Sequence, residues 1–350
     1  MIADSFPLKA QALRNTWGRW LLITVLLLSL CLATVAGWVM RDLPLARSVV
    51  DLTIEPGTPV RGIAQLSVDS GVEVNPSLLY WFMRLSGQSR LLRAGSYEIK
   101  AGDSAWDLLQ KISRGQESLQ TLVLVEGWTF RQFRAALDRS EHLQHQTRGQ
   151  TDEAVMALLG RPGQAPEGRF FPDTYAHGKG DSDVRILSRA MKAMDRQLAN
   201  AWQARAERNE LTTAEQALIL ASIVEKETGK ASDRRMISSV FHNRLRVGMP
   251  LQTDPTVIYG MGETFDGNLR RRDLQTDHPW NTYTRKGLPP TPIAMPGKAA
   301  LLAAVQPERS QAFYFVARGD GSSAFSANLE DHNAAVDRYQ RRRNPSSATP

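Results

Sequence analysis

A long apolar run near the N-terminus constrains this chain more than any other feature. Residues 20–40, WLLITVLLLSLCLATVAGWVM, carry no charge, and a helix of about 20 such residues crosses the hydrocarbon core of a bilayer. Trp17, Trp20 and Trp38 lie near its ends, where indole rings favour the membrane interface. A cleaved signal peptide is the competing interpretation, but its apolar region is only about 7–15 residues long. We therefore expect a retained transmembrane helix at 20–40.

The charges that flank this run predict its orientation. Lys9, Arg14 and Arg19 precede it, and Arg41 and Arg47 follow it. This bias places the N-terminal segment in the cytoplasm and the large C-terminal part outside. The single cysteine lies within the run, so one chain can form neither a disulfide framework nor a cysteine-based metal site.

The formal net charge of +7 is confined to the two ends of the chain. Residues 1–47 carry a surplus of three basic residues, and the segment from Arg338 onward carries a surplus of four. A nucleic-acid enzyme needs a basic face on its folded body to neutralise phosphates. Because the body of this chain is neutral, we expect no nucleic-acid partner.

The segment after the apolar run predicts a small module of strand, helix, helix and strand. The strand-like run VVDLTIEPGTPV begins at Val49 and precedes a helical pattern, RGIAQLSVDSGV. A second helix is expected at Pro76–Leu85, and LLRAGSYEIKAGDSAWDLLQKISRG predicts a short strand and a further helix. The order resembles a LysM-like module, a fold that grips N-acetylglucosamine chains elsewhere. Glycan binding and a purely structural spacer both fit the pattern.

The remaining chain predicts a larger domain of the α+β class. We expect a strand at Leu122–Val125, a helix at 131–137, an exposed loop or irregular helix within Glu141–Gln164, and a long amphipathic helix at Ser182–Asn209. The expected organisation is a cytoplasmic segment at 1–19, the membrane helix at 20–40, a linker at 41–50, the LysM-like module at 51–115, a catalytic domain at 120–340 and a disordered tail at 341–350.

The strongest local signal is LTTAEQALILASIVEKETGK, residues 211–230. Thr212 followed by Glu215 predicts a capping box at the start of a helix. The stretch from Ala217 to Val224 is almost wholly apolar, so this helix should be buried on most sides. Two glutamates, Glu225 and Glu227, follow near its C-terminal end.

A carboxyl group at that place has an unusual environment. Burial and the negative end of the helix dipole both raise its pKa, which is the property a general acid needs near neutral pH. A salt bridge between Glu225 and an arginine is the structural alternative. Helical phase does not distinguish Glu225 from Glu227, because each of them has apolar neighbours on its own face of the helix.

Polar residues downstream are candidates for contacts with sugar hydroxyl and acetamide groups. Asn243 lies near the buried face of the next expected helix, at about 232–247, where an unpaired amide is costly. Residues 281–297, NTYTRKGLPPTPIAMPG, predict a rigid loop rich in proline and glycine. A cap or turn role is the alternative for each candidate. The candidate substrate-binding residues are Asn243, Gln252, Thr253, Asp254, Tyr259, Asn281 and Tyr283.

Several motifs in order resemble the catalytic domain of the YceG-like endolytic murein transglycosylases. They are ILASIVEKET, VFHNRLRVGMPLQTDPTVIYG, NTYTRKGLPPTPIAMPG and FYFVARGDG with FSANLEDHN, within a similarity that covers about Val125 to Tyr339. The resemblance implies that the first glutamate of VEKE, Glu225, is the catalytic acid/base. One departure is that Ser323 and Ala324 precede Phe325, where the family often has a histidine.

This resemblance implies a lyase that cuts peptidoglycan glycan strands between N-acetylmuramic acid and N-acetylglucosamine. Glu225 would protonate the glycosidic oxygen, and the C6 hydroxyl of the muramic acid would then attack C1 to leave a 1,6-anhydro end. The reaction needs no metal and no organic cofactor. The implied location is the bacterial inner membrane, single-pass, with a periplasmic catalytic domain that trims nascent strands beside glycan-polymerising synthases.

Three other functions remain to be distinguished from this one. A hydrolytic muramidase would use Asp254 or Glu227 as a second carboxylate. A membrane-tethered scaffold would bind peptidoglycan without cutting it. A cytosolic lyase that acts on small molecules conflicts with the expected membrane helix.

Overall fold

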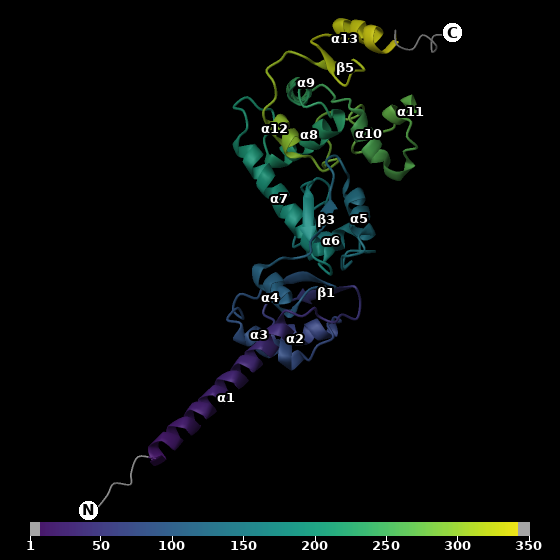
Figure 1. Ribbon diagram of the computed structural model, residues 1–350. Helices are drawn as coiled ribbons and strands as arrows, with labels where there is room; N and C mark the ends of the chain where they lie inside the picture. The colour runs from purple at the N-terminus through teal and green to yellow at the C-terminus, as the bar shows by residue number, and fades with distance from the viewer. Residues whose placement is uncertain (1–7, 342–350) are drawn as a thin grey trace, which may run out of the picture. The chain divides into compact units, whose positions relative to one another are not determined.

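The computed structural model describes residues 8–341 (Figure 1). The chain forms two compact units. The first runs to Gln120 and includes Gly178–Gly180, and the second covers Thr121–His177 and continues from Asp181. Among the described residues, the strands form three separate two-stranded sheets, β1 with β2, β3 with β4 and β5 with β6, and helices make up the rest of the regular structure. The fold is therefore a mixture of helices and small sheets.

The N-terminal helix α1 spans Leu8–Val39. Within it, Arg19–Val39 is long and apolar enough to cross a membrane, with a mean hydropathy of 2.4. These bounds agree with the expected helix at 20–40 to within one residue. Residues 1–7 of the expected cytoplasmic segment lie outside the described part of the chain.

The first unit contains the expected order of strand, helix, helix and strand. Strands β1 and β2 pair antiparallel, with Val49 opposite Lys100. Side chains from both strands and from the helices, including Leu52, Met83 and Leu108, are buried in one core. The elements after α1 are β1 Val49–Ile54, α2 Val60–Asp69, α3 Pro76–Leu85, β2 Gly95–Lys100 and α4 Ala105–Arg114. The likeness to a LysM module stays a prediction.

Local capping explains where the helices of this unit begin and end. The side chain of Asn75 accepts hydrogen bonds from the amides of Ser77 and Leu78, and Pro76 occupies the first position of α3. Ser104 and Asp107 form a capping box at the start of α4. Gly115 then ends α4 in the left-handed conformation, with φ of 67°.

The second unit is built mainly from helices around two apolar cores. One core surrounds α8 and α12, and the other lies between α5 and α7 (Figure 1). The elements are β3 Gln120–Val123, α5 Phe130–Arg139, α6 Asp152–Leu158, β4 Thr174–His177, α7 Asp183–Gln203, α8 Ala214–Glu227, α9 Arg234–Arg246, α10 Asp254–Met261, a 3-10 turn η1 Gly262–Thr264, α11 Arg271–Gln275, α12 Lys298–Val305, β5 Tyr314–Ala317, β6 Ser323–Ser326, α13 Leu329–Val336 and a π-helical turn η2 Asp337–Arg341.

Helix α8 is the central element of this unit. Every residue from Ala217 to Val224 is buried, which confirms that the helix is enclosed on most sides. Its closest helical partner is α12, and α7, α9 and α10 also pack against it. Helix α8 ends at Glu227, so Glu225 and Glu227 both lie on its last turn.

The expected capping box of α8 is wrong by one residue. Thr213, not Thr212, caps the helix by accepting a hydrogen bond from the amide of Gln216. The Gln216 side chain in turn accepts from the amide of Thr212. Glu215 instead forms an ion pair with Arg169, at 2.6 Å. The capping box expected from Thr212 required Glu215, but Glu215 pairs with Arg169 and Thr213 caps the helix.

Other expected elements differ in detail. The polar stretch at 141–164 contains a short helix, α6, whose cap is Thr151. The long amphipathic helix ends at Gln203, six residues before the expected end at Asn209. Residues 342–350 of the expected disordered tail lie outside the described part of the chain.

Candidate active site

Glu225 lies on the last turn of α8 with its side chain only 7% exposed. One carboxylate oxygen, Oε2, accepts a hydrogen bond of 2.8 Å from the amide of Gly297. Gly297 is the N-cap of α12, so the carboxyl group sits at the positive end of a second helix. The end of one buried helix therefore meets the start of another at this acid.

A second carboxylate, that of Glu126, also lies next to Gly297. A Cβ atom added to Gly297 would fall 1.9 Å from Glu126 Oε1. Only glycine therefore fits at this position with the present side-chain arrangement. The segment that carries Glu126 is tied to the same loop, because Gly127 donates a backbone hydrogen bond to Met295 and Met295 donates one to Trp128.

The pKa of Glu225 is raised from its ordinary value. Burial is the largest cause, and the negative charge of Glu126 acts in the same direction. The hydrogen bond from Gly297 and the charges of Arg234 and Lys226 oppose the rise. Because burial prevails, Glu225 holds a proton to higher pH than an exposed glutamate, as a proton donor requires.

Arg234, at the start of α9, is the cation nearest to Glu225. Its Nη2 atom lies 3.9 Å from Glu225 Oε1, which is an ion-pair distance but too long for a hydrogen bond. Its buried Nε atom has no hydrogen-bond partner among the described residues. The salt bridge that the sequence left open as an alternative is therefore present only as this loose contact.

Glu227 has a different environment two positions later. Its carboxyl accepts a hydrogen bond from the hydroxyl of Thr253. Burial raises its pKa to about 7, the charge of Asp254 adds to the rise, and Arg244 opposes it. At neutral pH this group therefore exchanges a proton readily.

Glu227 lines a cavity of about 450 Å³, named here the Glu227 cavity. Three predicted substrate-binding residues, Gln252, Asp254 and Tyr283, line it too. The Tyr283 hydroxyl donates a 2.5 Å hydrogen bond to Asp254. Gln252 has a φ of 49° and is the one non-glycine residue with positive φ in the described chain. Such strain often marks functional positions.

Three other predicted residues support the structure around these groups. Thr253 is buried and holds Glu227. Asn243 is buried, and its amide donates to the carbonyls of Ser310 and Ala312. Asn281 is also buried, donates to backbone carbonyls at 274 and 276, and accepts from the amide of Tyr283. The structure thus gives the two asparagines backbone partners.

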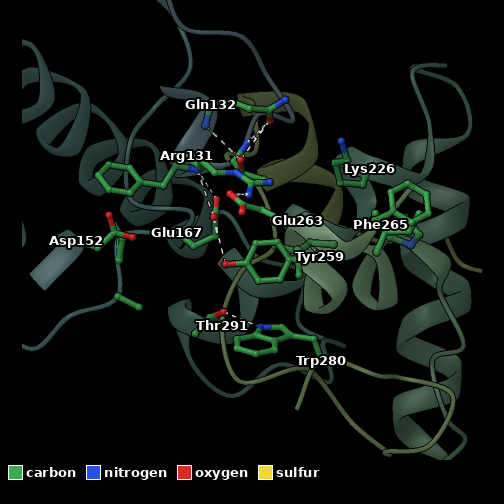
Figure 2. Close-up of a pocket in the computed structure, with 18 residues that line it drawn as sticks. Arg131, Gln132, Asp152, Glu167, Lys226, Tyr259, Glu263, Phe265, Trp280 and Thr291 are labelled. Atoms are coloured by element: carbon green, nitrogen blue, oxygen red, sulfur yellow. Dashed lines mark hydrogen bonds and ion pairs between the residues drawn. The ribbon is translucent and has the colours of Figure 1, made fainter. Parts of the chain in front are cut away.

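The last predicted residue, Tyr259, lies in a second and larger cavity of about 890 Å³, named here the Glu167 cavity. Figure 2 shows Tyr259 pointing towards Glu167, where its hydroxyl donates a 3.2 Å hydrogen bond to Glu167 Oε2. Trp280 packs edge-on against the Tyr259 ring and donates to Thr291. Lys226, the residue after Glu225, also lines this cavity.

Glu167 is a buried acid that the sequence did not single out. Its carboxylate also accepts hydrogen bonds from the amide of Phe130, at the start of α5. Burial raises its pKa to about 7. The signal that could have found it is the segment EGRFFPDTY, where one acid precedes two aromatic residues that become buried.

Other residues near Glu225 could not be found from the sequence. Glu126 and Arg234 lie in no pattern typical of catalysis, and Gly297 ends the predicted loop at 281–297, where nothing indicated that its amide would bind Glu225. Among the described residues, no group of histidine, cysteine and acidic side chains is arranged to hold a metal ion.

Comparison with known proteins assigns this arrangement to a family. The sequence profile of the YceG-like family matches residues 52–338. The chain belongs to the YceG-like family. The resemblance expected from the motifs is thereby confirmed.

Two named relatives and one solved structure are also similar to this chain. A relative from Bacillus subtilis (strain 168), named endolytic murein transglycosylase, is 29% identical over 84% of this chain and 86% of its own length. A relative of the same name from Streptococcus pneumoniae (strain D39) is 27% identical over 83% of this chain, which spans only 58% of that protein. The crystal structure of a YceG-like protein from Listeria monocytogenes matches 83% of this chain and 99% of its own, with a TM-score of 0.50 and 29% identity.

Proposed function

We propose that this protein is an endolytic peptidoglycan lytic transglycosylase whose catalytic acid/base is Glu225. The observation that carries the proposal is the state of that carboxyl. It is buried at the end of an apolar helix, bonded to one backbone amide, and has a raised pKa. The names of the B. subtilis and S. pneumoniae relatives support the same activity.

In the proposed reaction, protonated Glu225 donates its proton to the oxygen that joins N-acetylmuramic acid to N-acetylglucosamine. The C1–O bond breaks, and the C6 hydroxyl oxygen of the muramic acid forms a new bond to C1. The Glu225 carboxylate takes the proton of that hydroxyl. The products are a 1,6-anhydromuramic acid end and a free N-acetylglucosamine end, and Glu225 is protonated again.

The two cavities suggest where the glycan strand binds. The two residues that follow Glu225 line different cavities. Lys226 lines the Glu167 cavity, and Glu227 lines the Glu227 cavity. We propose that sugars on one side of the scissile bond contact Tyr259 and that sugars on the other side contact Gln252, Asp254 and Tyr283. Thr253, Asn243 and Asn281 would then position these contacts, because their own polar groups are occupied by protein.

We further propose that α1 anchors the protein in the bacterial inner membrane. Its apolar part, Arg19–Val39, supports this location. With the N-terminus in the cytoplasm, the second unit is the periplasmic catalytic domain. The enzyme would then act on nascent strands close to the synthases that polymerise them and limit their length. The first unit would serve as a glycan-binding module or as a spacer.

The test uses Glu225→Gln and the mass of the glycan ends. We expect the wild-type protein to release anhydro ends from uncrosslinked nascent glycan, and the variant to release none while it keeps its circular dichroism spectrum. A folded variant that still cleaves would exclude Glu225 as the acid/base. Binding to purified sacculi without any cleavage by the wild type would instead favour a non-catalytic scaffold.

One observation favours hydrolysis as a second candidate. Glu227, with a pKa of about 7, and Asp254 line the same cavity, and a muramidase uses a second carboxylate to activate water. The same measurement separates the two reactions, because a hydrolysed end is heavier than an anhydro end by one water. Reducing ends as the sole product would replace the transglycosylase proposal with this one.

A further inference from the structure

Helix α3 in the first unit exposes a stripe of large apolar side chains. Leu78, Trp81 and Leu85 are 48%, 53% and 78% exposed, and their spacing of three and seven positions places them on one helical face. The core-facing residues of the same helix, Leu79 and Met83, are fully buried. The stripe is therefore additional to the face that α3 needs for folding.

This stripe continues a contact between α3 and the end of α1. Phe82 lies next to Trp81 and four positions after Leu78, so it borders the stripe. Its ring packs edge-on against Trp38, with centroids 6.0 Å apart. Trp38 belongs to the last turn of α1, at the end of the apolar run.

The other end of α3 is also close to the end of α1. Asn75, the N-cap of α3, lines a cavity together with Trp38 and Arg41. A helix of this length extends only about 15 Å. The whole stripe therefore lies within a short distance of the place where α1 ends, and Figure 1 shows α3 beside it.

The segment that carries the stripe is basic, although the cavity beside Trp38 is also lined by Asp42 and Glu73. Residues 76–93 contain Arg84, Arg90 and Arg93 and no acidic residue, and all three arginines are exposed. Exposed tryptophan and leucine next to arginine are typical of helices that lie in a membrane interface, because the apolar side chains enter the acyl boundary while the guanidinium groups meet anionic headgroups.

We propose that the stripe of Leu78, Trp81 and Leu85 docks onto the surface of the membrane that α1 spans, with Arg84, Arg90 and Arg93 against anionic phospholipid headgroups. The inference rests on α1 as a membrane span and is independent of the reaction at Glu225. It makes α3 a second membrane attachment, so the first unit lies on the bilayer instead of pivoting freely on α1.

The test places a spin label on the stripe of the full-length protein in vesicles of phosphatidylethanolamine and phosphatidylglycerol. Cys31 is the single native cysteine, so Cys31→Ser gives a background for Trp81→Cys and, separately, Leu85→Cys. We expect both labels to collide several-fold more often with oxygen, which concentrates in the acyl region, than with a water-soluble nickel complex. Leu119→Cys is the matched control, since Leu119 is an apolar residue of the same unit with 50% exposure. Its label should prefer the nickel complex.

The proposal is overturned if the labels at 81 and 85 prefer the nickel complex as the control does. It is also overturned if they are shielded from both reagents and show label-to-label broadening that disappears on dilution with unlabelled protein, since a second copy would then cover the stripe. Vesicles of phosphatidylcholine alone should reduce the oxygen preference, and an unchanged preference would remove the role of the arginines. Flotation of the same vesicles reports on α1 separately, and Glu225 activity tests the enzyme proposal on its own.

Discussion

Glu225 and Glu227 share the last turn of α8, but the structure around each differs. Glu225 accepts a hydrogen bond from the backbone amide of Gly297 and lies near one acid, Glu126, and two cations, Arg234 and Lys226. Glu227 accepts a hydrogen bond from the hydroxyl of Thr253 and lies near one acid, Asp254, and one cation, Arg244. Burial raises the pKa of both. A raised pKa alone therefore does not identify the catalytic acid, and the two sites differ in the kind of donor, a backbone amide or a hydroxyl, and in the number of nearby cations.

These partners also imply different roles for the ionised forms. A backbone amide and an arginine stabilise the carboxylate that Glu225 becomes after it gives up its proton. Glu227 would become an anion beside Asp254 with Arg244 as its one nearby cation, so its ionised form gains less from its surroundings. Glu225 is therefore suited to a cycle of proton donation and return, and Glu227 to holding the loop that carries Thr253.

The sharpest test of this comparison is the pair Glu225→Gln and Glu227→Gln. Loss of a general acid lowers rates by about 10²–10⁴-fold, so we expect Glu225→Gln to lose at least about 10²-fold in kcat. Glu227→Gln keeps an oxygen that can accept from Thr253, and we expect it to lose less than about 10-fold. Release of anhydro ends from nascent glycan measures both. Equal losses would break the assignment of one catalytic acid.

The next largest effect is expected from Gly297→Ala. The added methyl group would collide with the Glu126 carboxylate, so either that side chain turns away from Glu225 or the amide that binds Glu225 shifts. A misplacement of about 1 Å can cost about 10²-fold in rate. The control is Gly229→Ala, because a Cβ atom there meets nothing within 4 Å. Similar activity in the two variants would show that the close fit of Gly297 against Glu126 does not affect the rate.

Glu167 provides a test of burial at an acid outside α8. Its pKa is raised from 4.5 to about 7, so the folded protein binds this proton more tightly than the unfolded chain. The contribution of Glu167 to the free energy of unfolding therefore falls as pH rises from about 4.5 to about 7 and is then constant.

We expect Glu167→Gln to remove this loss. Its stability relative to the wild type should rise between pH 5 and pH 8 by up to about 3 kcal/mol. Urea unfolding of the two proteins, followed by tryptophan fluorescence at both pH values, measures the difference. Glu227 titrates over the same range in both proteins, so its effect cancels. A difference that does not change with pH would mean that Glu167 is ionised throughout.

The smallest expected effect concerns the hydroxyl that holds Glu227. Thr253→Val keeps the volume of the side chain but leaves a buried carboxyl without its donor, which costs about 1–3 kcal/mol. It should also raise the pKa of Glu227 further, because the hydrogen bond from Thr253 lowers it. Thr253→Ser retains the hydroxyl and is the control. Equal unfolding midpoints for the two variants would show that the bond contributes nothing.

Sequence patterns predicted the elements whose causes are local. Asn75 with Pro76 and Ser104 with Asp107 mark helix starts that need no tertiary contact, and the apolar stretch of α8 predicted its burial. The cap of α8 was missed by one residue because Arg169, far away in the sequence, pairs with Glu215. Local capping patterns therefore predicted helix starts except where a distant residue, Arg169, binds the side chain that the pattern required, Glu215.

The candidate site was predictable in part for the same reason. The sequence led to Glu225 and to Gln252, Asp254 and Tyr283. The last three residues line the Glu227 cavity. The hydrogen-bond partner of Glu225, Gly297, lies about 70 residues further along the chain. No pattern within a single segment identifies an amide that binds so distant a side chain. Asn243 was expected to have a partner, but only the fold reveals that the partners are backbone carbonyls.

The left-handed backbone of Gln252 has a consequence for adapting this protein to heat. Glycine adopts that conformation freely, and relieving such strain is worth on the order of 1 kcal/mol. Selection for durability alone would therefore favour Gln252→Gly, which removes an amide from the Glu227 cavity. At this position thermal robustness and the proposed contact with glycan make opposite demands, so laboratory evolution for one should erode the other.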